Sequence, residues 1–257
     1  MDLVDRVAEH IKARFLSESS GHDWHHIRRV WRQARQIAVQ EGANQEIVEL
    51  GALVHDIADW KFHDGDERIG PREAERLLIQ EGAPEKLIAA VVDIVATISF
   101  KGAGVRTEMQ TIEGQCVQDA DRLDAIGAIG IARCFAYGGH AGRQMYDPAV
   151  LPELHATAEA YKSAQGTSLN HFHEKLFLLK ARMNTASGRA LAEKRHQGSG
   201  SKGDGVHGVL LIRAVLPTIM RAYALPANAA VAFRPPAPRR SHRRCRWLVC
   251  LTSSITA

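Results

Sequence analysis

The sequence predicts an all-α fold, and three observations favour it. Apolar residues recur at intervals of three and four over most of residues 1–195, which is the spacing of one face of a helix. The same stretch shows no clear alternation of apolar and polar residues of the kind that predicts strands. It also shows no internal repeat. We therefore expect a bundle of helices.

Five helices are expected in the first hundred residues, and the segment that joins the second to the third is short. Gly42 is expected to end the second helix. His22-Asp23 is expected to begin it, with Asp23 as the cap, and the alternative for this pair is a role behind the ligands of a site or at its substrate. Pro71 and Pro84 indicate where two others start, because proline fits the first turn of a helix. The expected ranges are 2–16, 23–42, 44–58, 71–81 and 84–97.

The next segments are less regular. Residues 115–135 are apolar around most of the helical circumference apart from a group of acids, which predicts one buried helix. The glycines and the proline of residues 136–150 indicate a loop. Two more helices are expected, over 152–163 and 168–194.

Composition excludes several classes of protein. The 257 residues are 45% hydrophobic and 24% charged, which excludes collagen-like chains, mucin-like stalks and wholesale disorder. None of the four cysteines forms a CxxC pair, so neither a disulfide framework nor a zinc ribbon is indicated. No run of about 20 apolar residues and no signal-peptide pattern occurs. We expect a soluble, cytoplasmic protein.

Charge and composition divide the chain near residue 197. Residues 198–257 hold nine Lys and Arg against one acid, a net charge of +8, whereas residues 1–197 carry −4. The run GSGSKGDG marks the boundary. The sequence therefore predicts a helical domain at 1–197 and a basic tail, rich in Pro, Ala and Arg, at 198–257.

Three interpretations of the tail stay open. It is a basic disordered arm that binds nucleic acid or an anionic surface, a small second domain, or a stretch that is not native sequence. About 60 residues of this composition offer little core. We favour the third interpretation, with a disordered arm as its alternative.

Two groups of residues suggest a metal site. His55 and Asp56 lie in a helix that is otherwise apolar, and Asp119, Asp121 and Asp124 fall within six residues, DADRLD. An aspartate in a buried helix needs an ion pair or a metal, and a cation relieves repulsion among carboxylates. Imidazole and carboxylate without thiolate suit one divalent ion: Mn, Fe, Ni, Zn or, less well, Mg.

The order of these motifs resembles the HD-domain superfamily of metal-dependent phosphohydrolases. His26 begins the run HIRRV, His55-Asp56 is the doublet, and Asp121 lies in DADRLD. The wider phrasing, including GHDWHHIRRV and QDADRLDAIGAIGIAR, is similar to a compact bacterial subfamily of stand-alone HD hydrolases. The resemblance covers residues 1–195. It implies that His26, His55, Asp56 and Asp121 are metal ligands, with Asp119 as the alternative to Asp121.

Other candidate residues have two interpretations each. Asp59, three residues after Asp56, is either the group that orients or deprotonates the attacking water or a solvated acid. Lys61 and Lys101 either neutralise phosphate oxygens or are surface charges. Arg29 either contacts phosphate or pairs with a core carboxylate.

The resemblance implies a phosphohydrolase that acts on nucleotides through a metal-bound water. Release of pyrophosphate from nucleoside triphosphates ranks first, and removal of phosphate from a monophosphate second. The alternatives are a non-catalytic nucleotide-sensing module and nucleic-acid binding through the tail. The expected partner is a small phosphorylated molecule. No membrane is expected, nucleic acid only through the tail, and the oligomeric state is left open.

Overall fold

The computed structural model describes residues 1–58, 63, 65–105 and 107–197. All of them belong to the first of the chain's two compact units, Met1–Ala224. Two of the candidate residues, Asp59 and Lys61, lie outside the described residues, and so does the tail at 198–257. Within the described ranges the regular structure is helical, with no strand, which confirms the all-α prediction.

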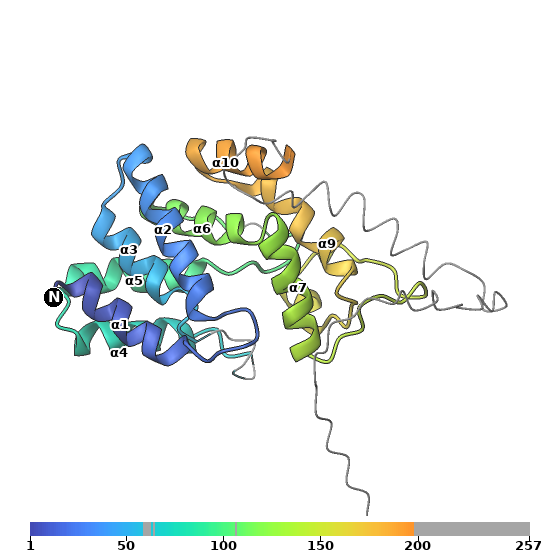
Figure 1. Cartoon of the computed structure of the whole chain (residues 1–257), viewed down its shortest axis with the longest axis horizontal. Coiled ribbons are helices and arrows are strands. Elements are labelled where there is room, and N and C mark those ends of the chain that lie inside the picture. The colour runs from blue at the N-terminus through green and yellow to red at the C-terminus, as the bar shows by residue number, and fades with distance from the viewer. Residues whose placement is uncertain (59–62, 64, 106, 198–257) are drawn as a thin grey trace, which may run out of the picture. The chain divides into compact units, whose positions relative to one another are not determined.

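Figure 1 shows the order of the helices, from α1 in blue to α10 in orange. Those of the described residues are α1 (Leu3–Phe15), α2 (Trp24–Glu41), α3 (Gln45–Val54), α4 (Ile69–Gln80), α5 (Glu85–Thr97), α6 (Ile112–Asp124), α7 (Ala128–His140), α8 (Ala158–Ser163), α9 (Asn170–Glu174), the 3₁₀ helix η2 (Leu176–Arg182) and α10 (Ala186–Gln197). None of these helices is long and apolar enough to span a bilayer.

The first five helices match the predicted ranges closely because local signals set their ends. The Asp23 carboxylate accepts a hydrogen bond from the backbone N–H of His26 and caps α2, which satisfies one of the free amides of the first turn. Gly42 ends α2 in the left-handed conformation, with φ of 70°. The α3 helix stops at Val54, short of the predicted residue 58.

The single helix predicted over 115–135 is wrong. The structure has two helices there, α6 and α7, separated by Gly127 with φ of +101°. A Cβ atom at Gly130 would lie 2.2 Å from the carbonyl oxygen of Ala125. The two glycines therefore permit a sharp turn that the apolar pattern hides. Because α7 continues to His140, the predicted loop over 136–150 is also partly wrong.

The two helices predicted over 152–163 and 168–194 are wrong in their extents. Only α8, six residues long, forms in the first range, and the second range is divided into α9, η2 and α10. The chain is extended at Met183 after the 3₁₀ helix. The following residues bond to a carboxylate of α6, so a contact distant in sequence decides where α10 begins.

Helix α2 lies at the centre of the described structure, where it packs against α3 and α6. Its apolar face joins two buried clusters: Ile27 belongs to one, with α1, α3 and α4, and Val30 to the other, with α6. His26, fully buried, lies in the first turn of the same helix, directly before Ile27. The packing of α2 against α3 and α6 therefore holds the His26 imidazole in place, and the ring points toward the ends of these two helices.

Candidate metal centre

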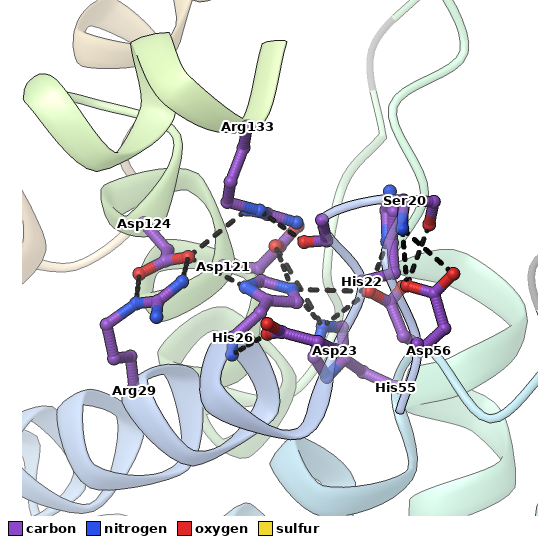
Figure 2. Close-up of polar contacts among 12 residues, drawn as sticks. Ser20, His22, Asp23, His26, Arg29, His55, Asp56, Asp121, Asp124 and Arg133 are labelled. Carbon is purple, nitrogen blue, oxygen red and sulfur yellow. Dashed lines mark hydrogen bonds and ion pairs between the residues drawn. The ribbon is translucent and has the colours of Figure 1, made fainter. Parts of the chain in front are cut away.

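Three separate elements bring four predicted side chains together. His26 lies in the first turn of α2, His55 and Asp56 follow the end of α3, and Asp121 lies on α6. Since α3 ends at Val54, His55 is its C-cap and the chain turns there. The neighbouring side chains of His55 and Asp56 therefore both reach the same point, beside the end of the helix (Figure 2).

Each of the two imidazoles lies within 4 Å of the other and of both carboxylates. His26 Nε2 lies 3.2 Å from His55 Nε2, 3.2 Å from Asp56 Oδ2 and 3.6 Å from Asp121 Oδ1. His55 Nε2 lies 3.3 Å from Asp56 Oδ2 and 3.9 Å from Asp121 Oδ1. Atoms bound to one ion at about 2.0–2.2 Å lie about 3.0–3.6 Å from one another. The spacing thus fits one divalent ion.

The imidazole rings give a further reason why a cation fits. His55 Nδ1 lies 2.8 Å from the Ala52 carbonyl oxygen and His26 Nδ1 lies 2.7 Å from Asp124 Oδ2. Both partners only accept hydrogen bonds, so each Nδ1 carries the proton. The two Nε2 lone pairs of the neutral rings then face each other across 3.2 Å. A proton or a metal ion between them relieves this repulsion.

The charges around the cluster also favour a positive charge at its centre. Burial lowers the pKa of His55, but Asp56 and Asp121 outweigh it and raise the pKa to about 9. Burial raises the pKa of Asp56, yet His55 and His22 hold it well below its usual range. Metal ligation requires a neutral imidazole, so an ion that binds near neutral pH displaces a proton from His55.

Asp124 orients His26 from behind. Its Oδ2 accepts from His26 Nδ1, and Arg29 forms a two-pronged contact with it, Nε to Oδ1 at 2.7 Å and Nη2 to Oδ2 at 3.0 Å (Figure 2). Arg133 of α7 adds a bond to Oδ2 at 3.2 Å. Burial raises the pKa of Asp124, but its bonds with His26 and Arg29 outweigh burial and hold the pKa far below its usual range.

Replacing Asp124 with asparagine is expected to lower affinity for Mn²⁺ by about 10- to 100-fold, the usual cost of losing a partner behind a metal ligand. Asparagine is neutral and has an NH2 group in place of one carboxylate oxygen. Where this NH2 group faces the N–H of His26 Nδ1, two donors oppose each other, so the ring loses its fixed orientation. Calorimetric titration with Mn²⁺ measures the effect, and Asp93→Asn, at an exposed acid of α5, is the control. Equal affinity in Asp124→Asn and the wild type would contradict the role of Asp124.

His22 is a member of the cluster that the sequence did not assign. Its Nδ1 lies 2.7 Å from Asp56 Oδ2, and with His26 and Asp56 it forms a second set of three closely spaced ligand atoms. Three residues had readable signals: His22 is the first histidine of GHDWHH, Asp124 lies one helical turn after Asp121, and Arg29 lies one turn after His26. Arg133 had none, because it comes from the helix beyond Gly127.

A cavity of about 270 Å³ opens from the cluster. His22, His55, Asp56 and Asp121 form one part of its wall. Three aromatic side chains and several cations form much of the rest: Phe100, Tyr137, Tyr161, Arg122, Arg133, Arg143, Lys162 and Lys175. The cavity therefore combines a candidate metal centre, positive charge and aromatic surface.

Aromatic and cationic side chains of this wall are already in contact with each other. Lys175 Nζ lies 5.3 Å from the centre of the Phe100 ring, and Arg143 lies over Tyr137 at 5.4 Å. Phe100 and Tyr161 meet edge to face at 5.4 Å. Such contacts hold long cations in place at the mouth of a site.

The structure places the remaining candidates elsewhere. Lys101 donates to Glu67 at 2.8 Å and does not line the cavity. Arg29 pairs with Asp124, as in the second of its two interpretations. Asp119, the alternative to Asp121, is fully buried and accepts bonds from Asn184 and Thr185. Asp121 is thus the acid of this pair that reaches the cluster.

Comparison with known proteins gives one family. The HD domain family model matches residues 23–126, a range that contains His26, His55, Asp56 and Asp121. The chain is 38% identical over 194 residues to the uncharacterised protein YpgQ of Bacillus subtilis, an alignment that covers 75% of this chain and 86% of YpgQ.

Solved structures agree with this result. A Lactobacillus plantarum protein is similar with a TM-score of 0.70 and 34% identity, covering 86% of this chain and 96% of its own. An HD-superfamily hydrolase of Bacillus thuringiensis has a TM-score of 0.57 and 36% identity, with 86% and 96% covered. The crystal structure of YpgQ in complex with ADP has a TM-score of 0.59 and 31% identity, with 87% and 98% covered.

Proposed function

The chain belongs to the HD domain family, and from this premise we propose that it hydrolyses nucleotides. Membership supports a metal-dependent phosphohydrolase in general. The observation that carries the proposal is the convergence of His26, His55, Asp56 and Asp121, the last three of which line the 270 Å³ cavity. We assign these four side chains as the ligands of one divalent ion.

A divalent ion held there would lower the pKa of water toward neutrality and polarise a phosphoryl oxygen. The chain's own residues then position the substrate. Arg133 lines the cavity and also bonds Asp124, the partner of His26, so its guanidinium suits a phosphate oxygen close to the reacting phosphorus. Three further cations of the wall suit the other phosphates: Arg143, Lys162 and Lys175.

A nucleotide fits the remaining surface of the cavity. Phe100, Tyr137 and Tyr161 offer aromatic faces against which a base can stack. YpgQ, which is similar to this chain, was crystallised with ADP, which supports a nucleotide as the ligand. The number of cations exceeds what a single phosphate requires, so we rank release of pyrophosphate from nucleoside triphosphates before hydrolysis of monophosphates.

The proposal assigns the reaction to residues 1–197. Every residue that it uses lies between His22 and Lys175, and none belongs to the predicted tail. Asp59 and Lys61, which lie outside the described residues, keep their two interpretations from the sequence. The metal is Mn, Mg, Ni, Fe or Zn, since this set of ligands accepts each of them.

The test is a release assay on metal-stripped protein. Nucleoside mono-, di- and triphosphates are supplied with Mn²⁺, Mg²⁺, Ni²⁺ or Zn²⁺, and phosphate and pyrophosphate are measured separately. We expect pyrophosphate from triphosphates, dependent on metal, and none from Asp56→Ala. Phosphate from monophosphates alone would favour the second-ranked reaction. Bound metal and bound nucleotide without turnover would favour a sensing module and contradict the proposal.

A further inference from the structure

A second cavity, of about 240 Å³, lies between α2, α6 and α10. It is separate from the first, because none of His26, His55, Asp56 and Asp121 lines it. Asp124 is the residue through which the two sites are connected: it bonds His26 and also lines this second cavity. The other polar residues of its wall are Arg29, Arg32, Gln33, Gln36 and Arg195.

Positive charge exceeds negative charge in this cavity. Of the described residues in its wall, three are arginines and one is an acid, Asp124, which already accepts bonds from Arg29, Arg133 and His26. A carboxylate offers about four acceptor positions, and these three residues supply four donors. Asp124 therefore has no acceptor left for Arg32 or Arg195.

Arg195 is a partly buried cation of this cavity that has no acidic partner among the described residues. Its guanidinium is partly buried and donates to the Leu123 carbonyl and to Gln33 Oε1 at 2.9 Å, both neutral acceptors. Burial lowers its pKa, and Asp124 offsets that only in part. Among the described residues no carboxylate pairs with it, nor with Arg32, which is exposed at the rim. A charged group held this way lacks a counter-ion.

The chemistry of the wall selects a small oxyanion. Guanidinium groups present paired N–H donors that match phosphate oxygens. Gln33 already accepts from Arg195, and its own amide bonds Gln36 at 3.3 Å, so the side chains around the opening offer mainly donors. Among the described residues of the wall, Ala120 is the only apolar one and none is aromatic, which disfavours a nucleotide base as the ligand.

We propose that the cavity between α2, α6 and α10 binds a phosphate-class anion through Arg32, Arg195 and Arg29. The ligand is inorganic phosphate or pyrophosphate. This site is independent of the proposed function, since it requires neither metal nor turnover.

Binding of anions to the full-length protein tests the proposal. Metal is chelated, the ionic strength is kept low because salt screens exposed charges, and inorganic phosphate, pyrophosphate and ADP are titrated in separate calorimetric series. The wild type is compared with Arg32→Gln and Arg195→Gln. Arg35→Gln is the matched control, because it removes the same charge from α2 at an exposed residue outside the cavity.

We expect Arg32→Gln and Arg195→Gln each to weaken one binding step roughly tenfold or more, the effect of losing a charged hydrogen bond, with Arg35→Gln unchanged. Equal weakening by Arg32→Gln and Arg35→Gln would show only general electrostatic attraction and would overturn the proposal. Anion affinity equal to that of the wild type in Arg32→Gln would overturn it as well. Arg32 is exposed, so this variant stays informative even where Arg195→Gln misfolds. ADP as the sole ligand would overturn the small-anion assignment, and loss of turnover alone would leave the site standing.

Discussion

Replacing Asp121 with alanine is expected to abolish metal binding while the protein stays folded. Asp121 Oδ1 lies 3.6 Å from His26 Nε2 and 3.9 Å from His55 Nε2. Its side chain is 36% exposed, so its removal leaves no large void. Loss of a direct ligand exceeds the 10- to 100-fold cost known for residues behind the ligands. Burial raises the pKa of Asp121, but attraction to His55 and His26 outweighs burial and lowers it. In the variant Asp56 still lies beside both imidazoles and keeps a carboxylate partner for them.

Two measurements on Asp121→Ala separate binding from stability. Titration with Mn²⁺ should show affinity reduced by more than about 100-fold. Thermal unfolding of the metal-free protein should show a change below about 1 kcal/mol, as for substitutions that bury no unpaired group. A variant that binds Mn²⁺ like the wild type would remove Asp121 from the set of ligands.

Asp119→Ala is expected to have the opposite effect: a large loss of stability with metal binding kept. Asp119 is fully buried and accepts from the backbone N–H groups of Asn184 and Thr185, both at 2.8 Å, and from the Thr185 hydroxyl at 2.8 Å. Each buried donor left without an acceptor costs about 1–3 kcal/mol. The variant should lose roughly 3 kcal/mol or more of its free energy of unfolding.

For a domain of this size that loss lowers the melting temperature by about 6–12 °C. Scanning calorimetry measures it, and Mn²⁺ titration well below the melting temperature should return the wild-type affinity. Asp121→Ala is the matched variant, since it removes the same side chain two residues away on the same helix. Loss of metal without loss of stability in Asp119→Ala would exchange the roles of the two acids.

The parts of the fold that the sequence predicts are those set by nearby residues. Helices α1 to α5 follow from apolar spacing, and caps such as Asp23 and Gly42 fix their ends. The division of 115–135 could not be read from hydrophobicity, because Gly127 and Gly130 lie among apolar residues on both sides. Likewise α10 begins where Asp119 holds Thr185, a contact that spans 66 residues.

The candidate site also contains residues that the sequence predicts and residues that it does not. His55-Asp56 and the acids of DADRLD are recognisable one motif at a time, whereas the resemblance supplied His26 and the choice of Asp121 over Asp119. The cations of the cavity carry no such signal: Arg143, Lys162 and Lys175 lie in or beside short elements whose places are set by tertiary packing. Lys101 was a reasonable candidate by sequence, but the structure occupies its ammonium with Glu67.

Helix α6 carries three aspartates that serve three different neighbours. Asp119 holds the start of α10, Asp121 reaches the metal cluster, and Asp124 holds His26 together with Arg29. Successive residues of a helix are about 100° apart, so one inserted or deleted residue between Asp119 and Asp124 would turn the later acids away from their partners. Over these six positions the chain is therefore constrained in its length as well as in its side chains, and natural variation in loop length must fall elsewhere.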